Sequence, residues 1–273
     1  MLPAEDAPLT TSVISSFGPN SSPRAREILT GLIRYLHAFC REVNLTTEEL
    51  YIAIEALNRL VDAQTQKLLE QDNGTNSCIL GPFYVADPPR YENGDNIIQK
   101  YLGGEVTYFH GRILDADTNQ PVEEFEFAGA SLNVWECAVN GLYDQQDPNQ
   151  PSGNMRGMFT SDSEGKYAFY CIKPVPYPVP YDGPAGDILK LMDRHPYRAG
   201  HIHFMVTRDS YNRLITQVFP EDDKYLDSDS VYAVKSDLLL KFKPYNSGSL
   251  KSIGGNDVAV KWEVNWDFKI KKQ

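Results

Sequence analysis

Apolar and polar residues alternate almost without a break near the end of this 273-residue chain. The apolar positions of the stretch are Val258, Val260, Trp262, Val264, Trp266, Phe268 and Ile270. Successive side chains of a strand point to opposite faces of a sheet, so this period of two predicts a half-buried β-strand. A helix is excluded there, because its apolar residues recur about every three to four positions.

Further short runs rich in β-forming residues occupy the middle of the chain. They span residues 106–114, 132–137, 166–173, 201–206 and 214–219. Turn signals such as Asp162-Ser163-Glu164-Gly165 separate the runs, and no helical pattern intervenes. Many short strands of this kind predict a mainly β chain with an antiparallel β-sandwich over residues 79–273.

The N-terminal part has a different pattern. Residues 1–23 are rich in Ser, Pro and Thr and predict a flexible arm. Residues 24–78 predict a helical region with two helices, 24–43 and 47–69, the second begun by a capping box of Thr46 and Glu49. Two helices cannot bury their apolar stripes alone, so these faces are expected to pack on the rest of the chain or on a second subunit.

Composition excludes several classes of protein. The net charge of −11 argues against a nucleic-acid or anionic-membrane partner, because both need a basic surface. We find neither a signal-peptide pattern nor an apolar run long enough to span a bilayer. The cysteines form no CxxC pair and are expected to be reduced thiols, so a cytoplasmic protein is expected; they are Cys40, Cys78, Cys137 and Cys171.

His201 and His203 are the first candidates for chemistry. They are one residue apart at the start of a predicted strand, so their imidazoles lie on the same face and could form half of a metal site. A hydrogen-bonded pair without metal is the alternative. A three-histidine zinc site would need His37, His110 or His195, and the first two are expected to be structural.

Tyrosine is another source of ligands, because a phenolate is an anionic oxygen donor that binds ferric iron. The chain has 16 tyrosines, so composition alone does not choose among them. Tyr143 follows the loop sequence Asn140-Gly141-Leu142, and Tyr177 stands between two prolines that hold the backbone rigidly. A packing tyrosine in an extended proline-rich loop explains the same residues.

Five blocks of sequence together resemble one enzyme family. They are Leu80-Gly81-Pro82-Phe83-Tyr84, the Tyr143 loop, Asn154-Met155-Arg156-Gly157-Met158-Phe159, the segment from Tyr177 to Gly186, and the segment from Arg194 to Phe204. In this order they are similar to the intradiol ring-cleavage dioxygenases, and more narrowly to the branch acting on catechol and hydroxyquinol. The resemblance extends over roughly residues 24–270.

The resemblance implies a non-haem Fe(III) held by Tyr143, Tyr177, His201 and His203. It implies that Tyr177 leaves the metal when the diol binds and takes a proton. Arg198 would stabilise negative charge on the substrate ring, and Gln217 would help to place the reacting oxygens. The apolar walls of the pocket would be Leu80, Gly81, Pro82, Phe83, Tyr84, Pro178 and Val179.

The implied reaction opens an aromatic 1,2-diol with O₂ to a cis,cis-muconate-type diacid. The Tyr143 loop and the Arg156 block favour hydroxyquinol as the substrate, with catechol or a substituted catechol as the alternative. The family also implies a homodimer through the N-terminal helices. Compared with the family, about twenty residues of the helix that covers the pocket are expected to be missing between Asn58 and Leu60; in the alternative alignment, Glu49 to Asp62 is that helix and an earlier helix is missing. The rival readings are a cupin or zinc hydrolase with a third histidine or a carboxylate, and a non-enzymatic β-sandwich binding module.

Overall fold

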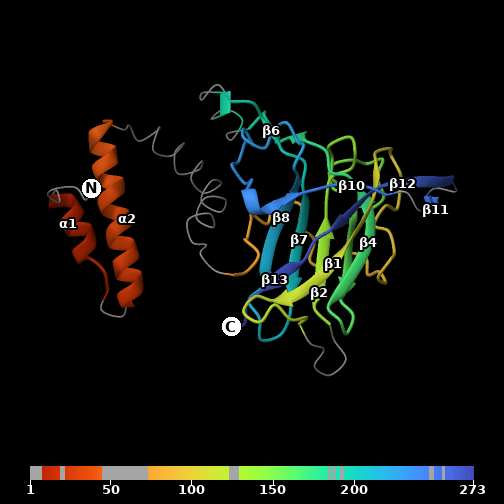
Figure 1. Cartoon of the computed structure of the whole chain (residues 1–273). Helices are drawn as coiled ribbons and strands as arrows, with labels where there is room; N and C mark the ends of the chain where they lie inside the picture. The colour runs from red at the N-terminus through yellow and green to blue at the C-terminus, as the bar shows by residue number, and fades with distance from the viewer. Residues whose placement is uncertain are drawn as a thin grey trace. The chain divides into compact units, whose positions relative to one another are not determined.

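The computed structural model describes residues 8–18, 22–44, 73–122, 129–183, 186, 189–190, 194–245, 249–253 and 256–273. The chain divides into two compact units, residues 1–57 and residues 58–273. Figure 1 shows the helices α1 and α2 in the first unit and the β-strands in the second. Among the described residues, no helix is both long enough and apolar enough to cross a membrane.

The first unit contains α1 (Pro8–Ser15) and α2 (Pro23–Glu42). The Ser22 hydroxyl accepts a hydrogen bond from the Ala25 amide at 3.1 Å, and the proline that follows Ser22 suits the first helical position. α1 lies within the stretch that we expected to be an irregular arm. Its Thr10 hydroxyl lies 3.0 Å from His37 Nδ1 on α2, a tertiary contact that local composition does not reveal.

Two expectations for the N-terminal region concern residues outside the described ranges. They are the second predicted helix, 47–69, with its Thr46 and Glu49 cap, and the shortening between Asn58 and Leu60. Residues 73–78, which we placed with the helices, bind the β-strands instead. The Thr75 amide donates to the Lys269 carbonyl at 2.9 Å, and the Cys78 amide donates to the Ile215 carbonyl at 2.8 Å.

The second unit contains two main sheets. The strands of the six-stranded sheet are β10 (Lys243–Pro244), β12 (Asn256–Asn265), β1 (Val106–Asp115) and β13 (Phe268–Ile270), with β4 (Lys166–Ile172) paired to β1 and β11 (Ser249–Ile253) paired to β12. The five-stranded sheet has the order β3 (Arg156–Thr160), β2 (Ser131–Trp135), β7 (Ile202–Thr207), β8 (Leu214–Pro220) and β9 (Leu239–Leu240). A 3₁₀ turn, η1 (Ser236–Leu238), precedes β9.

The main core lies between these sheets. Phe109 of β1, Phe169 of β4 and Phe204 of β7 are fully buried, and the Phe109 ring centroid lies 5.2 Å from that of Phe169 and 5.4 Å from that of Phe204. Burial of one such side chain contributes about 1.5–3 kcal/mol to stability. The mainly β sandwich predicted from the alternating pattern is therefore confirmed.

The sheets are mixed rather than purely antiparallel. β1 pairs in parallel with both β12 and β13, and β8 pairs in parallel with β9. The five short runs become β1, β2, β4, β7 and β8, and the C-terminal run becomes β12 and β13. The period of two was thus correct, but it reports which face of a strand is buried and not which strand is its neighbour.

Candidate metal centre and active site

The two histidines lie at the start of β7. His201 precedes the strand, and His203 is in register with Trp135 of β2 and Gln217 of β8. Both side chains are buried, and their Nε2 atoms are 3.2 Å apart. The two imidazoles therefore share one face, as the spacing predicted.

Neighbouring groups orient these rings. His201 Nδ1 lies 2.7 Å from the Ala199 carbonyl, which can only accept, so the proton of the neutral ring is on Nδ1 and Nε2 offers its lone pair. Gln217 Nε2 can only donate and lies 3.3 Å from His203 Nδ1, so in this arrangement Nδ1 accepts and the proton of the neutral His203 ring is on Nε2. Burial, and then the positive charge of Arg198, lower the pKa of both imidazoles well below the usual value. Both rings are therefore neutral at neutral pH, and the lone pair of His201 Nε2 is available to a cation. A cation at His203 Nε2 would displace the proton there.

The long proline-rich segment brings Tyr177 and Arg198 together. β5 (Tyr177–Pro178) and β6 (Tyr197–Arg198) form a two-stranded ladder in which Tyr177 pairs with Arg198. The Tyr177 hydroxyl lies 3.4 Å from His201 Nε2. The short ladder explains how residues 21 positions apart in the chain meet beside the histidines.

Tyr143 completes the group from the loop after β2. Its Oη lies 3.5 Å from Tyr177 Oη, and both side chains are buried. Gly141 has φ +78°, and a Cβ there would lie 3.1 Å from Tyr177 Cβ, so glycine allows the loop to approach Tyr177. Burial raises the pKa of both phenols, which are therefore neutral unless a cation binds beside them.

These donors fit a ferric ion. Two neutral imidazoles and two phenols converge within one buried cluster, and phenolates supply the hard, anionic oxygen that Fe(III) prefers. In the described part of the chain, no group of three or more His, Cys, Asp or Glu side chains could hold a metal.

The three other histidines bind elsewhere. The partner of His37 is Thr10 at 3.0 Å, that of His110 is Glu263 at 2.9 Å, and that of His195 is Ser228 at 2.9 Å. The described structure therefore offers phenols as the further donors beside the histidine pair, as the tyrosine alternative required.

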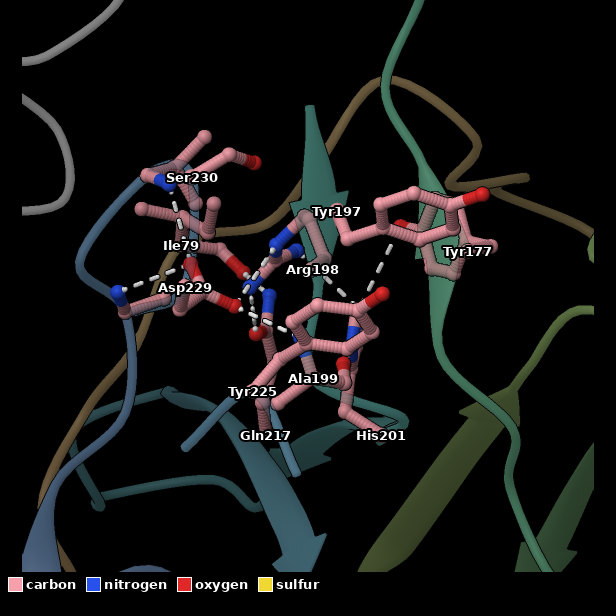
Figure 2. A network of polar contacts seen from close by, with 12 residues as sticks. Ile79, Tyr177, Tyr197, Arg198, Ala199, His201, Gln217, Tyr225, Asp229 and Ser230 are labelled. Carbon is pink, nitrogen blue, oxygen red and sulfur yellow. Dashed lines mark hydrogen bonds and ion pairs between the residues drawn. The ribbon is translucent and has the colours of Figure 1, made fainter. Parts of the chain in front are cut away.

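Arg198 and Gln217 lie next to each other beside His201 (Figure 2). Arg198 Nη1 lies 3.0 Å from His201 Nε2, and Arg198 Nη2 donates to Gln217 Oε1 at 2.8 Å. Gln217 Nε2 donates in turn to the Ile79 carbonyl at 2.9 Å. Burial works against the charge of Arg198, but the negative charge of Asp229 raises the pKa of Arg198 above its usual value. A fixed positive charge therefore faces the cluster.

Comparison with known proteins agrees with this geometry. The family model described as "Dioxygenase" matches residues 79–271, and the one described as "Catechol dioxygenase N terminus" matches residues 22–71. The chain is 40% identical to the catechol 1,2-dioxygenase of Candida albicans, over 96% of this chain and 91% of that protein. It is 34% identical to the hydroxyquinol 1,2-dioxygenase of a Rhizobium species, over 95% of this chain and 93% of that protein.

A solved structure agrees as well. The hydroxyquinol 1,2-dioxygenase of Pseudomonas putida aligns with a TM-score of 0.77 at 32% identity, covering 97% of this chain and 98% of that one. The chain belongs to the intradiol ring-cleavage dioxygenases. The chain is thus an enzyme, and the non-enzymatic binding module is set aside.

The segment that was predicted to line the dioxygenase pocket lies beside the tyrosines. Leu80, Phe83 and Tyr84 pack on the cluster that contains Tyr143, and the Phe83 and Tyr143 rings stack with centroids 4.4 Å apart. Gly81 touches the site most closely. It has φ +76°, and a Cβ at this position would lie 2.9 Å from His203 Cε1.

The other predicted wall residues lie further out. Pro82 and Pro178 are exposed, and Val179 is half-buried, with its amide donating to the Pro196 carbonyl at 2.9 Å. Their place in the dioxygenase pocket stays a prediction.

Several contacts that shape the dioxygenase site were not predicted from the sequence. The Trp135 ring stacks on His203 with centroids 4.8 Å apart and planes within 9°. Asp144, next to Tyr143, forms a buried ion pair with Arg156. Asp229 lies against Arg198 although 31 residues separate them in the sequence. Asp144 and Arg156 stood in segments used for the resemblance, but Trp135 and Asp229 did not, because their contacts depend on the fold rather than on local spacing.

Proposed function

We propose that this dioxygenase uses O₂ to open an aromatic 1,2-diol between its two hydroxylated carbons. The product is a cis,cis-muconate-type diacid. The metal would be a non-haem Fe(III) held by Tyr143, Tyr177, His201 and His203. The observation that carries the proposal is the convergence of two phenol oxygens and two imidazole nitrogens, with successive separations of 3.5, 3.4 and 3.2 Å.

When bound, Fe(III) would supply a Lewis acid and a template for the diol and O₂. The protein's own groups would then handle protons and charge. Tyr177 Oη is the base that we assign to one diol proton, because it lies on the histidine side of the cluster, 3.4 Å from His201 Nε2. Arg198 would stabilise negative charge on the ring, and Gln217 would orient the reacting oxygens through its bonds to Arg198 and Ile79.

We propose hydroxyquinol as the preferred ring, with catechol as the second candidate. The hydroxyquinol enzyme of Pseudomonas putida supports the first, because it aligns with a TM-score of 0.77 against 0.72 for a catechol enzyme of Pseudomonas arvilla. The 40% identity to the Candida albicans catechol enzyme supports the second. Oxygen uptake with hydroxyquinol, catechol, substituted catechols and protocatechuate, compared by kcat/KM, ranks the rings.

The visible spectrum of the iron-loaded enzyme tests the ligand set. Phenolate bound to Fe(III) absorbs visible light, so the protein is expected to be wine-red, and a diol should shift the band. Tyr143→Phe and Tyr177→Phe should each weaken the band and reduce turnover. Tyr167→Phe is the matched control, because Tyr167 is equally buried but donates to the Trp266 carbonyl at 2.6 Å instead. A colourless wild-type protein with a full complement of iron would refute the ligand set.

We also propose a homodimer formed through α2. The apolar side chains along this helix are 42–59% exposed within the described residues, and a symmetric pair of such faces would bury both; they are Ile28, Leu29, Leu32, Tyr35, Phe39 and Val43. Sedimentation should give twice the chain mass. Leu32→Glu should give a monomer, whereas Arg24→Glu, at an exposed i,i+3 ion pair, should not.

We propose a cytoplasmic location. Cys40, Cys78, Cys137 and Cys171 are all free, which suits a reducing compartment. Cell fractionation that followed the ring-cleaving activity into a secreted fraction would contradict this.

A further inference from the structure

Asp229 is a buried carboxylate that contacts Arg198 and the backbone of Ala199. Its Oδ2 accepts a hydrogen bond from the Ala199 amide at 3.0 Å and lies 3.4 Å from Arg198 Nε. Its Oδ1 accepts from the amides of Val231 at 2.9 Å and Ala233 at 3.4 Å. The side chain of Asp229 is 1% exposed and that of Arg198 is 4% exposed. The carboxylate is therefore fixed by backbone donors on both of its oxygens.

Asp229 and Arg198 interact as an ion pair. The 3.4 Å separation is an ion pair, and Arg198 Nε makes no hydrogen bond among the described residues. Two opposite charges that share a buried space hold each other in place, because either one alone would carry a large desolvation cost. Asp229 thus neutralises the charge of Arg198, which is too deeply buried to be solvated by water.

The rest of the guanidinium is held from other directions. Nη2 donates to Gln217 Oε1 at 2.8 Å, and Nη1 lies 3.0 Å from His201 Nε2. His201 Nε2 is the nitrogen that a metal would take, because Nδ1 is committed to the Ala199 carbonyl. Asp229 and Gln217 therefore hold two nitrogens of the guanidinium, and Nη1 faces His201, beside which Arg198 lies in Figure 2.

We propose that Asp229 is a positioning residue that fixes the guanidinium of Arg198 and keeps its Nη1 edge directed at the bound ring. This inference rests on the proposed function, because it assumes that Arg198 acts on the ring. Without the carboxylate, Arg198 would turn toward the other acceptors within its reach, of which the oxygen of Tyr177 is one. The loss would therefore change both turnover and the phenolate absorption band.

Asp223 provides a matched control. Its Oδ2 accepts from the Gly200 amide at 2.9 Å and its Oδ1 accepts from the Tyr225 amide at 2.8 Å. Asp223 therefore supports the backbone one residue further along than Asp229 does, without an ion pair to Arg198. Asp223 is half-buried and Asp229 is buried, so a loss at Asp229→Asn supports a positioning role only if its iron content stays near wild type while kcat/KM and the visible band change.

The test compares Asp229→Asn, Asp223→Asn, Arg198→Gln and the Asp229→Asn/Arg198→Gln double variant, all iron-loaded. Asp229→Asn should lower kcat/KM about 10- to 100-fold and shift the visible band, with iron content near wild type. Asp223→Asn should keep wild-type kcat/KM. In the Arg198→Gln background, Asp229→Asn should have no further effect, because both changes remove the same function.

The following results decide whether Asp229 positions Arg198. Equal kcat/KM and spectra for Asp229→Asn and Asp223→Asn would overturn the proposal, and so would a full additional loss in the double variant. If Asp229→Asn does not fold, Asp229→Glu moves the charge by one methylene. Lowered kcat with normal iron content then supports the proposal, and wild-type kcat overturns it. A wild-type enzyme that turns over no diol would instead refute the proposed function itself.

Discussion

Gly81→Ala is expected to introduce both backbone strain and a steric clash with His203, and comparison with Gly94→Ala separates the two effects. Gly81 has φ +76°, and an added Cβ would lie 2.9 Å from His203 Cε1, well inside van der Waals contact. A left-handed residue other than glycine costs about 1–2 kcal/mol. For a unit of this size, that cost corresponds to a fall in Tm of roughly 2–8 °C. The clash adds a displacement of the His203 ring, so iron affinity should fall as well.

Gly94→Ala isolates the first effect. Gly94 has φ +95°, and an added Cβ there would meet no atom within 4 Å, so it carries the backbone strain alone. Differential scanning calorimetry of the metal-free proteins should show similar falls in Tm for both variants, slightly larger for Gly81→Ala. Iron titration followed at the visible band should then show weakened binding for Gly81→Ala alone. Equal iron affinity in the two variants would refute the argument that Gly81 exists to admit His203.

Three further predictions concern buried titratable groups. Burial raises the pKa of Glu136 well above the usual value, so stability is lost as pH rises above the unfolded pKa of about 4.3. Urea unfolding between pH 5 and 8 should therefore show a flatter profile for Glu136→Gln, and an unchanged slope would contradict it. Asp144→Asn breaks the buried pair with Arg156 and should cost about 3–5 kcal/mol, measured by urea unfolding at pH 7. A loss under about 1 kcal/mol, typical of exposed pairs, would show that this one is solvated. Burial lowers the pKa of His201 and His203, so the metal-free protein in the Glu136→Gln background should lose stability as pH falls below about 6.5. If the His201→Asn/His203→Asn double variant loses the same stability as pH falls, these two histidines are not the cause of the loss.

Local patterns were sufficient for the strands and for the histidine pair. Alternation of apolar residues predicted β1 and β12, and the one-residue spacing of His201 and His203 predicted two rings on one face, which lie 3.2 Å apart. Both features depend only on the geometry of a single strand. The choice of Tyr143 and Tyr177 among 16 tyrosines needed the resemblance, because composition and spacing gave no preference.

The remaining features depend on which segments meet in space. The parallel pairing of β1 with β12 joins residues about 150 positions apart, and alternation carries no information about such partners. Asp229 is equally hidden, because it meets Arg198 only after β8 and the following loop have folded back. α1 was missed because its contact to α2, between Thr10 and His37, is tertiary rather than local.

The placement of β1 has a consequence for how the chain is made. One edge of β1 pairs with β4, which follows it by about 50 residues, but its other edge pairs with β12 and β13. During translation that second edge stays open until residues 256–270 leave the ribosome, long after Tyr143, Tyr177, His201 and His203 have emerged. Because such distant pairings form slowly, the nascent protein carries an exposed strand edge through about half of its synthesis, from residue 115 to residue 256. A fusion or truncation at the C-terminal strands would therefore reduce the yield of folded enzyme even though it lies far from the site.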